Sequence, residues 1–215
     1  MRNSLYGDPM ARMSPEDRRE AIVSATLAVL ERRGIAATTV RDVAAELGTS
    51  SGLIHHYFDS MDDLLAEAFA RVAGRDLAEM RDAVECGKDP IERLSLFFAA
   101  YARTEDTTIM QVWLDAWAEA SRRPTIQQIS RHLNEEWYAL LVFLIREGVA
   151  EGVMLCDDPE SASWRILSLL DGLMLQAVAH GGVVTFSQAA VWSRAGAERE
   201  LGLRPGVLSG VAAQA

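Results

Sequence analysis

Residues 39–58 read TVRDVAAELGTSSGLIHHYF, and this stretch decides how the chain folds. Thr39 is a good helix N-cap, and Asp42 follows three residues later as the acid of a capping box. Gly48 comes directly after the last apolar residue of this helix, where a left-handed turn favours glycine. A hydroxyl side chain after Gly48 can cap a second helix. We therefore expect two short helices joined by a tight turn, the arrangement of a DNA-binding helix-turn-helix.

The second helix is the candidate reader of DNA, and Phe58 at its end is expected to fill the core of the small domain. His56 and Tyr57 are expected to approach the phosphate backbone. Thr39 would donate its hydroxyl to a phosphate, and Arg41 would add positive charge. The residues expected to meet base edges are Ser50, Ser51, Gly52, Leu53 and His55. The two histidines have a plainer alternative as solvated surface imidazoles.

This pattern resembles the amino-terminal domain of the tetracycline-repressor (TetR) family of bacterial transcriptional regulators. The positions that match the family pattern are Gly34, Thr39, Gly48, Ser50, Gly52, Tyr57, Phe58 and Ser60. One position departs from it, because Met61 stands where the family usually has a lysine that touches a phosphate. The resemblance is strong over about residues 14–70. It implies an all-α protein with an N-terminal three-helix helix-turn-helix domain and a larger helical domain for ligand binding and dimerisation.

The rest of the chain also indicates helices, without the alternation typical of strands. Ser14 and Pro15 start a first helix that runs to Gly34, and Ser60 with Asp63 caps a fourth helix. Further helices are predicted over 89–101, 106–121, 125–151, 158–180 and 187–201. The expected domains are a DNA-binding domain over 14–60 and a helical effector-binding and dimerisation domain over 61–202, with flexible termini at 1–13 and 203–215.

Composition bounds the class of protein. At 215 residues the chain can bury a substantial core. It has no apolar run of about 18 residues and no signal peptide, so we expect a cytoplasmic protein with no membrane partner. Cys86 and Cys156 lack metal-ligand spacing, and we expect no metal and no cofactor. Phosphate-binding glycine loops, HExxH and GxSxG are absent from the sequence, which argues against an enzyme.

The formal net charge of −10 is unevenly distributed. Residues 1–60 hold 7 Arg against 8 Asp and Glu, whereas residues 61–215 hold 14 Lys and Arg against 23 Asp and Glu. A near-neutral amino-terminal domain can still present a basic face locally, but its non-specific affinity for DNA should be modest. The acidic remainder would repel DNA and so help to orient the molecule on the duplex.

Two long helices carry more apolar surface than a lone bundle needs. The residues expected at a dimer interface are Leu140, Leu144, Ile166, Leu170, Leu173 and Met174, with Gly172 allowing close approach of backbones. An intramolecular core is the alternative, and helical periodicity does not separate the two. The family resemblance favours a homodimer, whose two recognition helices, one or more DNA turns of ~34 Å apart, would read a palindrome.

Residues 169–177, LLDGLMLQA, are similar to the Asp-Gly-Leu motif of BetI-type carboxy-terminal domains, a group named for the choline-sensing repressor of betaine synthesis. Aromatic and acidic side chains at helical spacing suggest a pocket for a cationic or aromatic effector. The candidates are Tyr101, Asp106, Met110, Trp113, Trp117, Trp137, Trp164 and Asp171. An ordinary aromatic core is the alternative, and Asp171 could instead bind Arg165, a backbone amide or a partner subunit.

The sequence therefore predicts a homodimeric repressor of a palindromic operator in duplex DNA, released by a small-molecule effector. Two alternatives stay open at this point: a ligand-independent helical module that binds DNA or protein, and a small helical enzyme. Sequence-specific binding to duplex DNA would separate the regulator from both.

Overall fold

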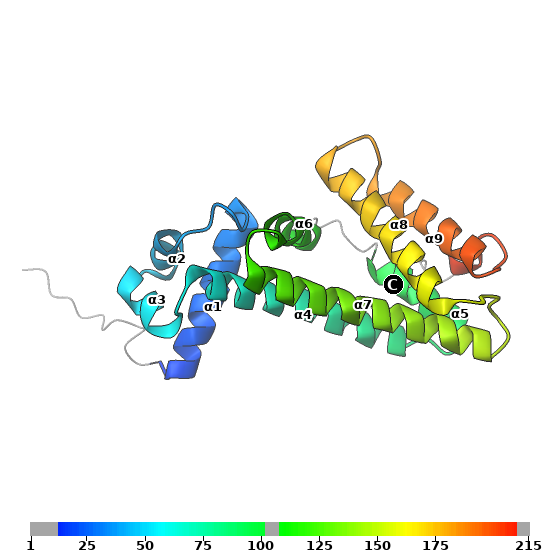
Figure 1. The fold of residues 1–215 in the computed structure, drawn as a ribbon, viewed down its shortest axis with the longest axis horizontal. Coiled ribbons are helices and arrows are strands. Elements are labelled where there is room, and N and C mark those ends of the chain that lie inside the picture. Colours follow the sequence, from blue (N-terminus) through cyan, green and yellow to red (C-terminus); the bar gives the residue numbers. More distant parts are fainter. Residues whose placement is uncertain (1–12, 102–107, 210–215) are drawn as a thin grey trace, which may run out of the picture. The chain divides into compact units, whose positions relative to one another are not determined.

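The computed structural model describes residues 13–101 and 108–209. Within these ranges the fold is all-helical and contains no strand, which confirms the predicted fold class. Figure 1 traces the helices in chain order from blue to red. They are α1 (Pro15–Arg33), α2 (Val40–Leu47), α3 (Ser51–Tyr57), α4 (Met61–Glu85), α5 (Pro90–Tyr101), α6 (Thr108–Ala120), α7 (Pro124–Ala150), α8 (Pro159–Ala179) and α9 (Phe186–Glu200), followed by the 3-10 turn η2 (Val207–Ser209).

The first helices begin where the capping signals predicted. Ser14 accepts a hydrogen bond from the backbone N–H of Asp17 at 3.0 Å, and Thr39 accepts one from the N–H of Asp42 at 3.3 Å. Each acid accepts in return from the N–H of its cap residue, so both capping boxes are complete. Ser60 caps the start of α4 in the same way. The predicted starts of α1, α2 and α4 are confirmed.

Two glycines shape the turns on either side of α2. Gly34 follows α1 with φ 77° and ψ 163°, a combination that essentially only glycine adopts. Gly48 follows α2 in the left-handed region with φ 68° and ψ 33°. The backbone N–H of Thr49 then donates a hydrogen bond to the carbonyl of Ala44 at 2.9 Å, which terminates α2. The predicted left-handed turn at Gly48 is confirmed, and it allows α3 to begin at Ser51.

Contacts divide the described chain into two compact units. Unit 1 holds the described residues up to Val72 together with Asp115–Ser130. Unit 2 holds the described residues of Ala73–Leu114 and those from Arg131 onward. The sequence suggested a boundary at residue 60, whereas the first half of α4 and the junction of α6 with α7 group with α1–α3. No helix in the described parts of the chain is both long and apolar enough to cross a membrane.

Unit 1 closes around a small apolar core to which all of its first four helices contribute. The buried members of this core are Ile22, Val23, Ala25, Val43, Ala44, Ile54, Phe58, Leu64 and Ala68. Phe58 is 4% exposed, which confirms the core role expected for it. Because Ile54 and Phe58 are the buried positions of α3 and its cap, the apolar core fixes which face of α3 turns toward solvent.

Residues 203–209 differ from the flexible tail expected after Gly202. The buried carboxylate of Glu198 on α9 accepts hydrogen bonds from the backbone N–H of Gly206 at 2.9 Å and of Leu208 at 3.0 Å. Leu208 itself is 1% exposed. These bonds join a side chain to backbone eight and ten residues away, so no local sequence pattern indicated them. The remaining parts of the expected flexible termini, 1–12 and 210–215, lie outside the described residues.

Replacing Gly34 with alanine should destabilise the protein by about 1–3 kcal/mol, because a Cβ strains the backbone at this φ and ψ. Gly48→Asn is the matched control, since asparagine tolerates the left-handed region in which Gly48 lies. The measurement is the free energy of unfolding from urea denaturation of both variants and the parent protein. Equal losses in the two variants would contradict the conformation assigned to Gly34.

Candidate nucleic-acid interface and ligand site

The short helix α3 has one face anchored in the core and one face open. Ile54 is 1% exposed and belongs to the unit 1 core. The predicted base-reading residues lie on or beside the open face: Ser50, Gly52 and His55 are exposed, and Ser51 and Leu53 are partly exposed. His56 is exposed as well. A helix that enters the major groove needs this arrangement, because its base-reading side chains must be free while its other face is held.

Tyr57 and Thr39 each have a structural role beside the expected phosphate contact. Tyr57 is partly buried, packs against the unit 1 core and meets the ring of His56 edge-on at a centroid distance of 5.3 Å. The hydroxyl of Thr39 donates to the carboxylate of Asp42 at 2.5 Å. A phosphate contact by Thr39 would therefore compete with the capping box of α2.

Acidic neighbours already pair two of the arginines near α2. Arg32 lies 2.5 Å from Glu46, and Arg33 pairs with Asp42. The hydrogen bond from Thr39, aided by Arg33, lowers the pKa of Asp42, so this carboxylate stays charged near neutral pH. Arg41 is exposed and forms no ion pair within residues 13–101 or 108–209. Arg41 is thus an available cation for a DNA phosphate.

Met61 is the first residue of α4 and occupies the position where a phosphate-binding lysine is usual. Its side chain is partly buried and packs against the unit 1 core. The departure from the family pattern therefore exchanges a surface cation for apolar packing. This exchange leaves one positive charge fewer at the start of α4.

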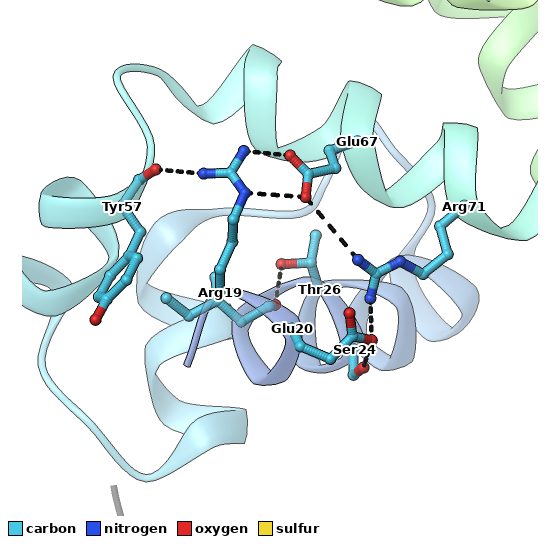
Figure 2. A network of polar contacts seen from close by, with 8 residues as sticks. Arg19, Glu20, Ser24, Thr26, Tyr57, Glu67 and Arg71 are labelled. Carbon is cyan, nitrogen blue, oxygen red and sulfur yellow. Dashed lines mark hydrogen bonds and ion pairs between the residues drawn. The ribbon is translucent and has the colours of Figure 1, made fainter. Parts of the chain in front are cut away.

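The C-terminal end of α3 is held by Arg19, a residue that no sequence signal singled out. Arg19, on α1, donates from Nη1 to the backbone carbonyl of Tyr57 at 2.8 Å. The same guanidinium binds the carboxylate of Glu67 on α4 through two nitrogens, with Nε to Oε1 at 3.2 Å. Figure 2 shows Arg19 between Tyr57 and Glu67. These partners lie 38 and 48 residues from Arg19 in the chain, so only the folded structure reveals the contact.

In unit 2, a carboxyl group lies beside a cluster of aromatic rings. The hydroxyl of Tyr101 donates to Oδ1 of Asp171 at 2.5 Å. The ring of Trp137 is 5.7 Å from that of Tyr101 and 6.0 Å from that of Phe97, edge-on in both cases. We call Phe97, Tyr101, Trp137 and Asp171 the α5–α7–α8 cluster. The structure thus brings three predicted ligand residues together and adds Phe97, a buried residue of α5 that was not among the predicted ligand residues.

The electrostatics of the α5–α7–α8 cluster favour a cation. Burial raises the pKa of Asp171 to about 6, although its hydrogen bond with Tyr101 acts in the opposite direction. Burial, with the charges of Asp171 and Asp76, raises the pKa of Tyr101 well above its ordinary value, so the phenol keeps its proton. Asp171 makes no ion pair with any residue that the structure describes. A positive ligand would offset the desolvation of this carboxylate.

The other predicted ligand residues that the structure describes lie on α6 and α8. Met110 and Trp113 are buried on α6 within unit 2, whereas Trp117 belongs to unit 1. Trp164 stacks on Tyr138 with ring centroids 4.6 Å apart and is 44% exposed. Asp106 lies outside the described residues. In the part of the chain that the structure describes, no three His, Cys, Asp or Glu side chains are grouped to hold a metal ion.

Four of the six predicted dimer residues lie inside the chain's own core. Leu144, Ile166, Leu170 and Met174 are each 3% exposed or less, which supports the intramolecular alternative for them. Their side chains have almost no surface left for a partner. Leu140 and Leu173 are partly exposed. Helical periodicity did not separate the two alternatives, since a stripe of leucines marks an apolar face without saying which apolar surface covers it.

A different apolar surface is open on α8 and α9, which pack against each other in unit 2 (Figure 1). The nitrogen Nε of Arg165 on α8 donates to Glu200 on α9 at 2.9 Å. The exposed apolar side chains of these helices are Trp164, Leu169, Leu175, Val191 and Trp192. Gly172 is exposed too, and a Cβ at this position would meet no atom within 4 Å. We call these residues the α8–α9 surface.

Two family models match this chain. Residues 22–68 match the model for bacterial regulatory proteins of the tetR family, and residues 90–202 match the model for the C-terminal domain of BetI-type transcriptional repressors. The first match contains α2 and α3. The second contains the whole α5–α7–α8 cluster and the α8–α9 surface.

Relatives and solved structures agree with these matches. The HTH-type transcriptional regulator BetI of Burkholderia cenocepacia (strain HI2424) is 34% identical over 175 residues, which cover 79% of this chain and 86% of that protein. A transcriptional regulator from Pseudomonas aeruginosa PAO1 has a TM-score of 0.77 and 32% identity, over 95% of this chain and 96% of that chain. A regulator from Saccharomonospora viridis, solved in complex with choline, has a TM-score of 0.80 and 26% identity, over 86% and 98% of the respective chains.

Arg41 and His55 should affect DNA binding in different ways. Arg41→Ala should weaken binding to all duplexes and reduce the slope of log affinity against log salt by about one, because one phosphate contact is lost. His55→Ala should change the preferred base at a defined position, at a cost of about 1–3 kcal/mol, because it removes a base-edge contact. Fluorescence anisotropy with a selected operator and a scrambled duplex at several salt concentrations measures both effects. An unchanged salt slope in Arg41→Ala would contradict its phosphate contact.

Proposed function

Because this chain belongs to the TetR family of bacterial regulatory proteins and carries a BetI-type repressor domain, we propose that it acts as a homodimer on an inverted-repeat operator. It is a DNA-binding transcriptional repressor and not an enzyme. We propose further that a small organic cation releases it from the operator. It would meet both partners in the cytoplasm, where bacterial DNA lies.

The observation that carries the cationic effector is the pairing of Asp171 with aromatic rings in the α5–α7–α8 cluster. A quaternary ammonium has no N–H to donate, so it is bound by the faces of aromatic rings and by a nearby negative charge. Trp137, Tyr101 and Asp171 supply these two kinds of contact from three helices. The choline complex of the Saccharomonospora viridis regulator supports the same class of ligand for this chain.

Release of DNA requires that the cation and the operator prefer different conformations. A ligand shifts an equilibrium only by the difference in its affinity for the two states. The continuous helix α4 contains Glu67, which binds Arg19 in unit 1, and Asp76, whose charge acts on Tyr101 in unit 2. We propose α4 as the element whose two arrangements favour either the operator or the cation.

The α8–α9 surface is the proposed dimer interface. It joins large exposed apolar side chains with Gly172, at which a partner helix could approach closely. Exposed apolar side chains that gather on two neighbouring helices are typical of an interaction surface. A twofold dimer would present two copies of α3 to two half-sites of an inverted repeat.

The test of this function is selection from randomised duplex DNA, followed by titration of choline onto the complex. The expected result is an inverted repeat in the bound pool and release of that DNA by choline but not by a neutral alcohol of similar size. Enrichment of a single half-site would contradict the dimer. Retention of the operator at saturating choline and other quaternary ammonium ions would contradict the cationic effector.

Asp171→Asn should lower choline affinity by about tenfold or more, because it removes a negative charge whose attraction for a cation about 4 Å away exceeds ~1.4 kcal/mol in a partly buried site. Choline affinity of the parent protein should fall as the pH drops below about 6, where Asp171 takes up a proton. The control is Asp157→Asn, which removes an exposed acid from unit 2. Isothermal titration calorimetry between pH 5 and 8 measures both effects. Equal affinity in the two variants at pH 7 would contradict the site.

The raised pKa of Asp171 also predicts how stability depends on pH without ligand. Its folded-state pKa of about 6 lies above the ordinary value of 3.8, so its contribution is present below pH 3.8 and is lost as the pH rises through 6. Asp171→Asn should therefore be at least as stable as the parent protein at pH 7. This result, from thermal unfolding, separates loss of ligand binding from loss of fold.

Leu175→Glu should convert the dimer into a monomer, because it places a charge in the apolar α8–α9 surface where a partner would bury it. The matched control is Leu155→Glu, since Leu155 is 74% exposed in the loop before α8. Analytical ultracentrifugation gives the oligomeric state of each variant. A Leu175→Glu variant that remains dimeric would place the interface elsewhere.

A further inference from the structure

We propose that Arg19 is a positioning residue for DNA reading, and that the guanidinium group sets the direction of α3 by tying its last carbonyl to α1 and α4. The proposal rests on the DNA-binding function of the family and adds a residue outside α2 and α3 to it. It concerns contacts within unit 1 only. Arg19 would act on DNA through α3 and would not itself touch a base.

Helix α3 needs such a contact because it cannot hold its own geometry. It is seven residues long, and isolated helices shorter than about 12 residues are marginal in water. Its N-cap, Ser50, makes no side-chain hydrogen bond to the helix. At the other end, the carbonyl of Tyr57 belongs to the last turn, whose carbonyl groups lack partners within the helix. The bond from Arg19 to this carbonyl, 2.8 Å long, fixes the free end.

The guanidinium of Arg19 makes three different contacts at once. It donates to the carbonyl of Tyr57, binds the carboxylate of Glu67 through two nitrogens, and lies 4.2 Å from the centroid of the Phe58 ring. A planar fork with five N–H donors can do this, whereas a lysine ammonium is a point charge that cannot reproduce the paired geometry. The three partners come from the end of α3, its cap and α4. Their relative positions are thereby coupled.

A second arginine holds Glu67 from the other side. Arg71 lies one turn further along α4, 3.9 Å from Glu67, and also pairs with Glu20, the neighbour of Arg19 on α1. Figure 2 shows the alternating charges of Glu20, Arg71, Glu67 and Arg19, which end at the carbonyl of Tyr57. The carboxylate that orients Arg19 is therefore itself oriented. A small rotation of α4 would move Arg19 and with it the end of α3.

The exposure of these side chains indicates that the network orients α3 more than it stabilises the fold of unit 1. The side chain of Arg19 is 44% exposed and that of Glu67 is 31% exposed. Ion pairs at this exposure contribute little to folding, because water screens them. The apolar core holds unit 1 together without them, as the burial of Ile54 and Phe58 shows. Removing the network should therefore leave the fold intact and change the direction of α3.

The experiment compares Arg19→Lys and Glu67→Gln with the matched control Arg75→Lys. Arg75 pairs with Glu79 on the same helix α4, at 2.8 Å, and its side chain is 80% exposed. Each full-length variant is titrated with the selected operator and with a scrambled duplex of the same length at several salt concentrations. A stoichiometric titration sets the active fraction, and thermal unfolding reports the fold.

Arg19→Lys should bind the operator about tenfold more weakly, as expected when one good base contact is misplaced, and bind the scrambled duplex as the parent does. Glu67→Gln keeps a hydrogen-bond acceptor for Arg19, so this variant should lose less operator affinity than Arg19→Lys. The salt slope and unfolding temperature should stay close to those of the parent, and Arg75→Lys should change nothing.

Three results would overturn the proposal. Equal weakening on both duplexes would indicate a loss of folded protein, and a salt slope reduced by about one would indicate a direct phosphate contact by Arg19. Unchanged operator affinity would show that the contact is dispensable. A separate outcome concerns the parent protein: if it did not prefer the operator over the scrambled duplex, this would contradict the proposed DNA-reading function itself, and the proposal for Arg19 with it.

Discussion

The constraint on which DNA reading depends is the length of α3. Seven residues make only two turns, so neighbouring elements must set the direction of the helix. Three kinds of contact do this. The left-handed turn at Gly48 sets where α3 starts, burial of Ile54 sets which face is open, and Arg19 holds the carbonyl at its end. A helix held at both ends and along one side can present small polar side chains to base edges in a fixed register.

The small number of available positive charges in unit 1 makes the direction of α3 more important for binding. Affinity that comes from counterion release grows with the number of phosphates that a protein neutralises. In unit 1, Arg32 and Arg33 are paired with acids, and Met61 replaces a usual phosphate-binding lysine with an apolar contact. Among the described residues of unit 1, fewer cations then remain for non-specific binding. A larger share of the binding free energy must come from correctly placed base contacts, which depend on the direction of α3.

The sequence predicted the local features of the fold and missed the contacts between distant residues. Capping boxes and the turn at Gly48 span three to five residues, so their signals are visible in the chain, and the structure contains them. The contact between Arg19 and Tyr57, and that between Tyr101 and Asp171, join residues 38 and 70 positions apart. Contacts between distant residues also explain why the sequence did not indicate the ordered tail after Gly202. They explain in the same way why it did not show which surface covers the leucines expected at a dimer interface. Apolar periodicity marks a buried face, but the covering surface is a property of the folded chain.

The two units use carboxylates in opposite ways. Glu67 is bound by Arg19 and faces Arg71, so its charge is satisfied and its position is fixed. Asp171 has a phenol as its hydrogen-bond partner and no ion pair in the described parts of the chain, so burial raises its pKa. A satisfied carboxylate has little to gain from an added cation, whereas a part-buried carboxylate without a cation has much to gain. In our proposal, Asp171 is therefore the place where a cationic effector would act on the protein, and Glu67 is the place where a change in α4 would reach the helix that reads DNA.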